Sequence, residues 1–237
     1  MITLNEYLNL SMIEIILFFY RKFKSKFFPT SHHKMVAKWY REGGDFDLLF
    51  NNPLNSESIV FDIGGFTGNF VSELFSRSPC KIYIFEPIKK YNLTIKNRFI
   101  LNNMIKVFPF GLSNKTESTF IDVKGQASST FKKDIDNSGN QDVEKIKLVD
   151  VVEFINEQKI SEIDLMNINI EGGEYDLIPR LFEQNKVVDI KYIQIQFHNL
   201  DKTCTQKKDD IRNLLKETHI CEFCYEFVWE KWIRKDI

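Results

Sequence analysis

The segment 59–70 constrains the fold of this chain more than any other, because a strand, a glycine turn and a helix start follow one another without a gap. Its first residues, 59–61, are β-branched or aromatic, as expected of a strand buried on both faces of a parallel sheet. Asp62 and three glycines between 64 and 68 come next, and such a turn lets a ligand approach main-chain N–H groups. The segment predicts a strand, a turn that holds a nucleoside-like ligand, and a helix.

The chain has 237 residues and a formal net charge of −1. This length allows one α/β domain with a large core, and we expect that domain at 46–237, after an N-terminal helical extension at 1–45. The balanced charge gives no reason to expect a nucleic-acid partner. Four scattered cysteines and the lack of an evident signal peptide favour a cytoplasmic protein.

An apolar run at 10–20 is followed by four basic residues at 21–26. It is shorter than the ~20 residues of a membrane-spanning helix, so no transmembrane segment is predicted. Segment 10–26 either makes weak peripheral contact with a membrane or packs on the domain or on a second subunit, which leaves a homo-oligomer open. A short helix is predicted from Ser31, a cap-like residue, to the glycines at 43–44.

A second strand is predicted at 81–85, and it ends in Glu86. Glu86 follows Gly68 by 18 residues, close to the ~20 that separate a glycine turn from the acid that binds ribose hydroxyls in a Rossmann unit. We therefore predict that Glu86 binds a ribose, although an acid at the end of a surface strand would look the same.

A helix at 88–99 and a third strand at 105–110 complete a β-α-β-α-β alternation. Residues 119–123 fit an added strand. The polar segment 124–145 has no periodicity and suits a loop over a site, where Ser128 either contacts the ligand or belongs to an unspecific loop.

Two later strands carry polar residues at alternate positions, so that each polar set shares one face of its strand. The sets are Asn167, Asn169 and Glu171 on the first strand, and Gln194, Gln196 and His198 on the second. Buried amides without partners cost roughly 1–3 kcal/mol each, so we expect these sets to meet each other, water or a ligand. Ligands of open α/β sheets bind outside the carboxyl ends of the strands, which places Asn169, Glu171 and His198 beside the glycine turn.

Glu174 lies at the start of a further helix, where a carboxylate is favoured for structural reasons. Pro179 predicts a break or kink of that helix near Ile178. The tail predicts a helix around 211–215 and a strand at 220–228. A single CxxC at 221–224 lacks a second pair, so no metal site is predicted.

The order of these motifs resembles the FkbM family of S-adenosylmethionine-dependent methyltransferases, from about 35 to 232. The blocks that carry the resemblance are Val60 to Gly68, Ile84 to Pro87, and Ile163 to Glu174 continuing to Gln196, Phe197 and His198. It implies an α/β, Rossmann-like sheet of seven mostly parallel strands, with helices on both faces and an antiparallel C-terminal hairpin. It also implies that Glu86 binds the ribose of S-adenosylmethionine. The methionine part would be held by Asp62 and by the backbone of Gly64, Gly65, Phe66, Thr67 and Gly68.

The chain departs from the family pattern in two places. Asn167 and Asn169 stand where the family usually has Lys-x-Asp, and Gln196 replaces an acid two residues before His198. Hard cations prefer carboxylates, so these changes disfavour a divalent metal and leave His198 or Glu171 as the base, with Asn169 beside them.

The resemblance implies a sugar hydroxyl as the methyl acceptor, in a sugar nucleotide or a surface-polysaccharide precursor. Two other functions stay open from the sequence. One is a nicotinamide-dependent oxidoreductase, although the glycine spacing does not match G-x-G-x-x-G. The other is a cofactor-binding relative without catalysis, in which Asn167, Asn169 and Gln196 have replaced working groups.

Overall fold

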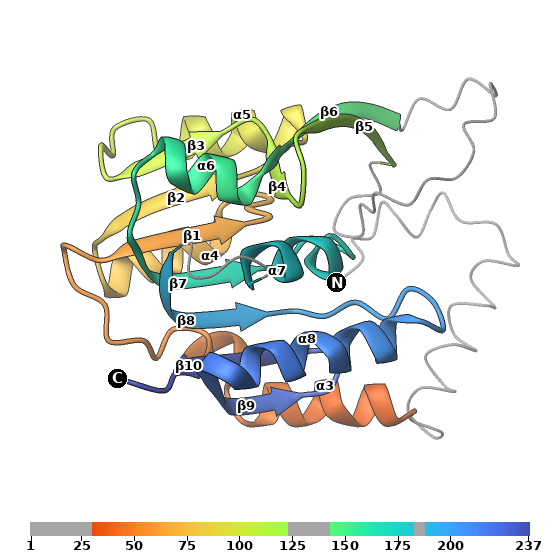
Figure 1. Ribbon diagram of the computed structural model, residues 1–237. Coiled ribbons are helices and arrows are strands. Elements are labelled where there is room, and N and C mark those ends of the chain that lie inside the picture. Colours follow the sequence, from red (N-terminus) through yellow and green to blue (C-terminus); the bar gives the residue numbers. More distant parts are fainter. Residues whose placement is uncertain (1–29, 123–142, 183–187) are drawn as a thin grey trace, which may run out of the picture.

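The computed structural model describes residues 30–122, 143–182 and 188–237. Its main sheet has seven strands in the order β3-β2-β1-β7-β8-β10-β9 (Figure 1). The strands are β1 (Ile59–Ile63), β2 (Lys81–Phe85), β3 (Ile105–Phe108), β7 (Glu162–Ile168), β8 (Asp189–Ile195), β9 (His219–Tyr225) and β10 (Trp229–Arg234). Strand β10 runs antiparallel to both of its neighbours, and the remaining pairs are parallel. The predicted fold class is confirmed.

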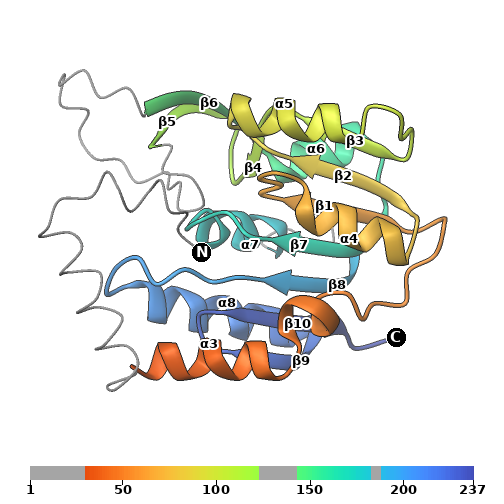
Figure 2. The ribbon, with the colours of Figure 1, turned by 180° about the vertical axis from the view of Figure 1, so that it is seen from behind.

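Helices cover both faces of this sheet (Figures 1 and 2). Helices α4 (Asn69–Arg77) and α5 (Lys89–Arg98) pack on one face, over β1, β2 and β3. Helices α6 (Val151–Glu157), α7 (Glu174–Phe182) and α8 (Cys204–Thr218) pack on the other face, where the larger apolar cluster lies. The strands are therefore buried on both sides, which explains why β1 reads as a nearly continuous apolar run.

Helix α3 (Ser31–Arg41) and the π-helical turn η1 (Gly44–Leu48) pack against the β9–β10 end of the sheet. Thr30 caps α3, because its side chain accepts a hydrogen bond from the backbone N–H of His33. Trp39 is buried against Tyr225 and Trp229. Segment 10–26, for which a membrane or subunit contact was expected, lies outside the described residues.

A second, smaller sheet lies beyond the carboxyl end of β3. Its strands are β4 (Gly111–Ser113), β5 (Glu117–Asp122) and β6 (Val143–Asp150), in the order β4-β6-β5. Ile121 and Ile146 of this sheet pack against Ile88 and Tyr91 beside α5. Only β5 has a counterpart in the sequence prediction.

A row of buried polar residues crosses the main sheet in register. Asp62 lies opposite Asn167, Asn167 opposite Gln194, and Gln194 opposite Lys231. The Gln194 amide donates to the carbonyl of Leu49 at 2.9 Å, and the Lys231 ammonium donates to that of Asn51 at 2.7 Å. Of the polar sets predicted on two strands, Asn167 lies in β7 and Gln194 in β8, where they are opposite each other. The other members come after the strands end at Ile168 and Ile195.

Local contacts explain the bounds of helices α6 and α7. Helix α6 begins at Val151, because the Asp150 side chain accepts hydrogen bonds from the N–H groups of Val152 and Glu153 and so caps the helix. The predicted break near Ile178 is wrong, since α7 continues through Pro179 to Phe182. The buried side chains of Leu177 and Ile178 hold this helix against the core.

Candidate functional site

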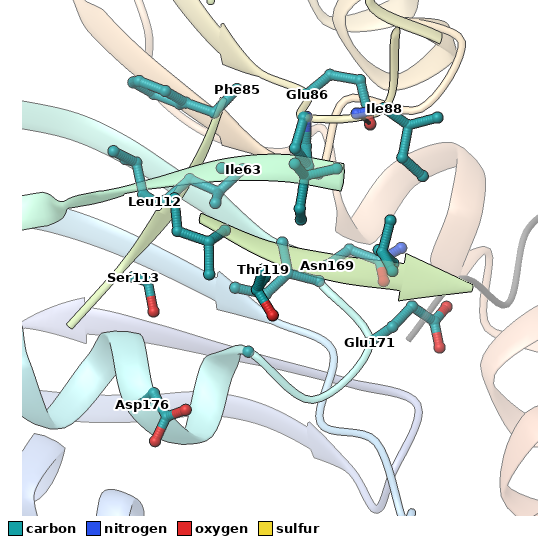
Figure 3. Close-up of a pocket in the computed structure, with 18 of the residues that line it drawn as sticks. Ile63, Phe85, Glu86, Ile88, Leu112, Ser113, Thr119, Asn169, Glu171 and Asp176 are labelled. Carbon is teal, nitrogen blue, oxygen red and sulfur yellow. Dashed lines mark hydrogen bonds between the residues drawn. The ribbon is translucent and has the colours of Figure 1, made fainter. Parts of the chain in front are cut away.

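Two cavities lie at the carboxyl edge of the main sheet. The first has a volume of about 650 Å³ and lies between the ends of β1, β2 and β7 and the small sheet (Figure 3). The second has a volume of about 1100 Å³ and is enclosed by α3, the segment after β8 and the β9–β10 turn. Residues of the predicted site line both cavities.

Gly64 brings the end of β1 against the end of β7. Its φ is +92°, and a Cβ at this position would lie 2.0 Å from the backbone oxygen of Asn169. The N–H of Gly64 donates to the carbonyl of Phe85 at 3.0 Å, which ties the turn to β2 as well. Because of this close approach, only glycine fits at position 64, where the turn and β7 meet. Gly64 and Phe66 of the turn line the first cavity.

The other glycines of the turn face its packing side. A Cβ on Gly65 would meet Ile84, and a Cβ on Gly68 would meet Phe99. Arg98 of α5 fixes the same turn, since its guanidinium donates to the carbonyl of Thr67 at 3.0 Å. Asp62, Gly65, Thr67 and Gly68, all predicted to bind cofactor, are not among the residues that line the first cavity.

The carboxylate of Glu86 lines the first cavity and is held by backbone groups on both sides. Oε2 accepts from the N–H of Phe66 and Oε1 from the N–H of Ile88, each at 2.8 Å. Burial raises the pKa of Glu86 to about 7, against the lowering effect of these two hydrogen bonds. Phe66 has a φ of +48°, so the turn adopts a left-handed conformation at the residue that donates to Glu86.

Asp62 is 2% exposed and has one partner. Its Oδ1 accepts from the amide of Asn167 at 2.9 Å, while Oδ2 is buried without a hydrogen-bond partner. Burial raises the pKa of Asp62 to about 6, only partly offset by the bond from Asn167. A neutral amide at 167 leaves this carboxylate without the adjacent cation that a lysine would supply.

His198 lies between two carboxylates. Its Nε2 is 3.4 Å from Oε2 of Glu171, and its Nδ1 is 3.1 Å from Oε1 of Glu174. Burial alone would lower the pKa of His198, but the hydrogen bonds to Glu171 and Glu174 outweigh it and raise that pKa to about 9. At neutral pH the imidazole is therefore a cation.

Glu174 has a structural role that the sequence hinted at. It is fully buried, and its carboxylate accepts from the N–H groups of Gly172 and His198 as well as facing the imidazole. Tyr175 adds a second tie, because its hydroxyl donates to the carbonyl of His198 at 2.8 Å. The loop after β7 is thereby fixed to the segment after β8. Glu171 in this loop has a φ of +50°, a strained conformation for a side chain of this type.

Asn169 and Gln196 line both cavities. The Oδ1 atom of Asn169 is buried without a hydrogen-bond partner. Glu171 lines the first cavity and His198 the second, so their ion pair also reaches from one cavity to the other. Figure 3 shows Asn169 and Glu171 on the same side of the first cavity, away from Leu112 and Phe85.

The structure thus brings Gly64, Phe66, Glu86, Asn169 and Glu171 together around the first cavity and places His198 at the second. Ser128 lies outside the described residues. Within the part of the chain that is described, no cluster of three or more His, Cys, Asp or Glu side chains is arranged to hold a metal ion. The same part contains no helix with the length and hydropathy needed to span a membrane.

Sequence reasoning missed Asn92 and Arg98, which support the site from α5. The Asn92 amide donates to the carbonyls of Glu86 and Phe108, where β2 and β3 end. The helical pattern of apolar residues identified the buried face of α5 but gave no reason to examine a polar residue on that face. A buried asparagine between apolar positions is the signal that would have found it.

Comparison with known proteins gives a family model and a set of distant structures. The structures include a putative rRNA methylase from Clostridium thermocellum, with 9% identity over 76% of this chain and 90% of that one and a TM-score of 0.44. They also include fibrillarin from Aeropyrum pernix, with 7% identity over 84% of this chain and 74% of that one and a TM-score of 0.44. The N-methyltransferase NodS from Bradyrhizobium japonicum is 9% identical over 86% of this chain and 85% of that one, with a TM-score of 0.39.

No curated protein matches the chain. The family model is the methyltransferase FkbM domain, and it matches residues 62–224, from the acid of the glycine turn to the C-terminal hairpin. This span is more than half of the chain and includes both strand ends that form the site, so the chain belongs to the FkbM methyltransferase family.

Proposed function

We propose that this protein is an S-adenosylmethionine-dependent O-methyltransferase that acts on a sugar hydroxyl, in a sugar nucleotide or in a capsule or O-antigen precursor. The observation that supports it best is the position of Asn169 and Gln196, which line both cavities. A donor in the first cavity and an acceptor in the second would meet at these residues. The four cysteines are free thiols, which agrees with a cytoplasmic setting.

The residues of the first cavity fit the cofactor. Its volume of about 650 Å³ lies within the roughly 300–1,000 Å³ of small-molecule sites. Each oxygen of Glu86 has one backbone partner and can accept a further hydrogen bond from a ribose hydroxyl. The methionine part would lie beside Asn169, which lines the same cavity. When bound, S-adenosylmethionine supplies a methyl group activated by the sulfonium.

Glu171 is the group that we assign to accept the acceptor's proton. An imidazole whose pKa is raised to about 9 has no free lone pair at neutral pH, so His198 is poorly suited to be the base. The imidazolium instead holds the Glu171 carboxylate at 3.4 Å and is itself fixed by Glu174. His198 is therefore a positioning residue, and Asn169 orients the donor on the other side.

Alignment contributes more than proton transfer in this scheme. Well-oriented reactants can gain about 7–11 kcal/mol, whereas a base that accelerates a reaction by 10²–10⁴ supplies about 3–5 kcal/mol. The features that fix alignment are the rigid Gly64 contact with Asn169 and the buried Glu174 that joins the loop after β7 to the segment after β8.

Calorimetry with S-adenosylhomocysteine tests the cofactor assignment. The full chain is expected to bind it, and Glu86→Gln is expected to weaken binding about tenfold or more, because a carboxylate accepts ribose hydroxyls more strongly than an amide. Gly111→Ala is a matched control in the same cavity, since its new methyl would crowd only the flexible end of Leu148, at 2.9 Å, and would lie at ordinary contact distance from Pro87. If the wild-type chain bound neither S-adenosylhomocysteine nor S-adenosylmethionine, the proposal would be rejected.

A further inference from the structure

The stretch 87–116 is positively charged, although the chain as a whole is nearly neutral. The chain has 33 acids against 32 lysines and arginines, but none of these acids lies between 87 and 116. A stretch with one sign of charge favours contact with a surface of the opposite sign. The cations of this stretch are Lys89, Lys90, Lys96, Arg98, Lys106 and Lys115.

Helix α5 presents part of this stretch to solvent. Its buried residues, Tyr91, Asn92 and Ile95, pack towards the sheet, so the opposite side of the helix is exposed. Residues that are three or four positions apart share one side of a helix, and on this side lysines alternate with aliphatic residues. We call this side, together with the turn that follows it, the α5 face. It consists of Lys89, Lys90, Leu93, Lys96, Ile100 and Leu101.

The aliphatic side chains of the α5 face are exposed to solvent. Leu93 is 50% exposed, Ile100 74% and Leu101 95%. Ile100 and Leu101 are adjacent in the turn between α5 and β3. Single exposed apolar residues are common on protein surfaces, whereas a group of them with polar neighbours marks an interaction site.

The contacts of α5 leave this face positive. One acid, Glu144, reaches the helix at its first turn, where its carboxylate accepts from the backbone N–H of Lys89 at 2.8 Å. Arg98 is not part of the face, because its guanidinium is hydrogen-bonded to the glycine turn and to the start of α4. The cation closest along the chain to the exposed pair in the turn is thus Lys96, one helical turn before Ile100.

From the lysines and the exposed aliphatic residues together, we propose that the α5 face docks on an anionic lipid bilayer. Ile100 and Leu101 would enter the boundary of the acyl chains while the lysines contact the headgroups. A second copy of the chain is disfavoured as the partner, because a two-fold axis through the face would place lysines against lysines. A nucleic acid is disfavoured because its bases stack on aromatic rings, and this face presents aliphatic side chains.

Docking through the α5 face leaves both cavities accessible. Strand β3 begins at Ile105, so the turn with Ile100 and Leu101 lies at the amino edge of the main sheet, whereas the cavities lie at the carboxyl edge. Helix α5 lies at the opposite end of the molecule from α3 (Figures 1 and 2). The α5 face is also separate from segment 10–26, and docking through it is independent of the proposed methyl transfer.

Flotation of the full chain with lipid vesicles tests this docking. The vesicles contain phosphatidylcholine alone or with about one third phosphatidylglycerol. The chain is expected to bind the anionic vesicles about tenfold or more tightly than the neutral ones, and more weakly at about 0.5 M than at about 0.1 M salt, because salt screens the lysines. The double variant Ile100→Ser, Leu101→Ser should weaken binding about tenfold or more. Lys96→Gln should weaken it about fivefold, the effect of one charge near an anionic leaflet, and Lys96→Arg should bind normally.

Ile220→Ser is the matched control, because Ile220 is 59% exposed on β9, at the opposite edge of the main sheet from β3. It should bind vesicles as the wild type does, and urea denaturation checks that each variant is folded. The proposal is overturned if the wild type binds neutral and anionic vesicles equally or binds neither, or if the double variant binds as tightly as Ile220→Ser. It is also overturned if sedimentation shows a wild-type dimer that the double variant converts to a monomer, since the face would then belong to a subunit interface.

Discussion

The Nε2 atom of His198 lies 3.4 Å from Oε2 of Glu171, and this pair joins the loop after β7 to the segment after β8. Glu171 faces the first cavity and His198 the second. The ion pair therefore lies between the two cavities, as do Asn169 and Gln196, which line both. Its position explains why the proposed base is a carboxylate held by an imidazolium and not a free histidine.

Replacing Glu171 by glutamine should remove the proposed base while keeping the size of the side chain. We expect kcat to fall by about 10²–10⁴, the usual contribution of a general base. Cofactor affinity should change less than about threefold, because Glu171 is not part of the turn that we propose holds the nucleoside. Single-turnover methyl transfer and calorimetry measure the two effects. Equal kcat values for wild type and Glu171→Gln would remove Glu171 from the mechanism.

Protonated His198 should stabilise the folded protein, and this stabilisation should be lost at alkaline pH. Its pKa is raised to about 9 in the folded chain against about 6.5 in an unfolded one. The protonated form is therefore stabilised by folding, fully below about pH 6.5, and this contribution is lost as the pH rises through 9. It amounts to about 3 kcal/mol at most.

The comparison of wild type with His198→Gln isolates this term. The difference in free energy of unfolding, measured by urea denaturation, should be largest near pH 6 and should shrink by roughly 2–3 kcal/mol towards pH 9.5. Methyl transfer by the wild type should decline over the same alkaline range as His198 loses its charge. A difference in stability that does not vary with pH would show that the ion pairs of His198 contribute nothing.

Asp62→Asn should stabilise the protein without its ligand at neutral pH. The pKa of Asp62 is raised to about 6 from its ordinary value of 3.8, so folding favours its protonated form and stability falls as the pH rises between these values. Asparagine keeps an acceptor for the Asn167 amide and carries no charge. The gain over wild type should grow by up to about 3 kcal/mol between pH 4 and pH 7. A pH-independent gain would contradict this explanation.

Gly64→Ala should damage both stability and cofactor binding. The new methyl would lie 2.0 Å from the Asn169 backbone oxygen, on a residue with a φ of +92°. We expect a loss of roughly 2–4 kcal/mol in the free energy of unfolding, together with loss of S-adenosylhomocysteine binding. Gly111→Ala, where the flexible end of Leu148 can move aside, should change stability by less than about 1 kcal/mol. Similar effects of the two substitutions would contradict the specific role of Gly64.

Much of the fold could be predicted because its signals are local. The apolar run before Asp62, the glycine turn and the acid 18 residues later define a β-α-β unit within one segment, and the family of the chain followed from the same blocks. The alternation of Asn167 with Asn169 predicted a polar face on this strand, but β7 ends at Ile168, and Asn167 shares its face with the apolar Ile163 and Leu165. The assignment of Glu86 to the ribose stays a prediction.

The rest depends on contacts between distant segments. Lys231 completes the polar row only because β10 inserts antiparallel beside β8, which places it opposite Gln194. The packing of Gly65 on Ile84 likewise depends on how the turn lies over β2. That Gln196 lines two cavities follows from their shapes, which no spacing along the chain encodes.

The most direct test of the proposed O-methyl transfer is to supply S-adenosylmethionine carrying a ¹³C-labelled methyl group. The acceptors are methyl glycosides and nucleoside-diphosphate sugars of common hexoses and 6-deoxyhexoses, and NMR follows the label. The predicted result is a methoxy signal on a sugar carbon, present with wild type and reduced by about 10²-fold or more in Glu171→Gln. A label that appears on nitrogen, or that stays on a cofactor shown by calorimetry to be bound, would contradict the proposed O-methyl transfer.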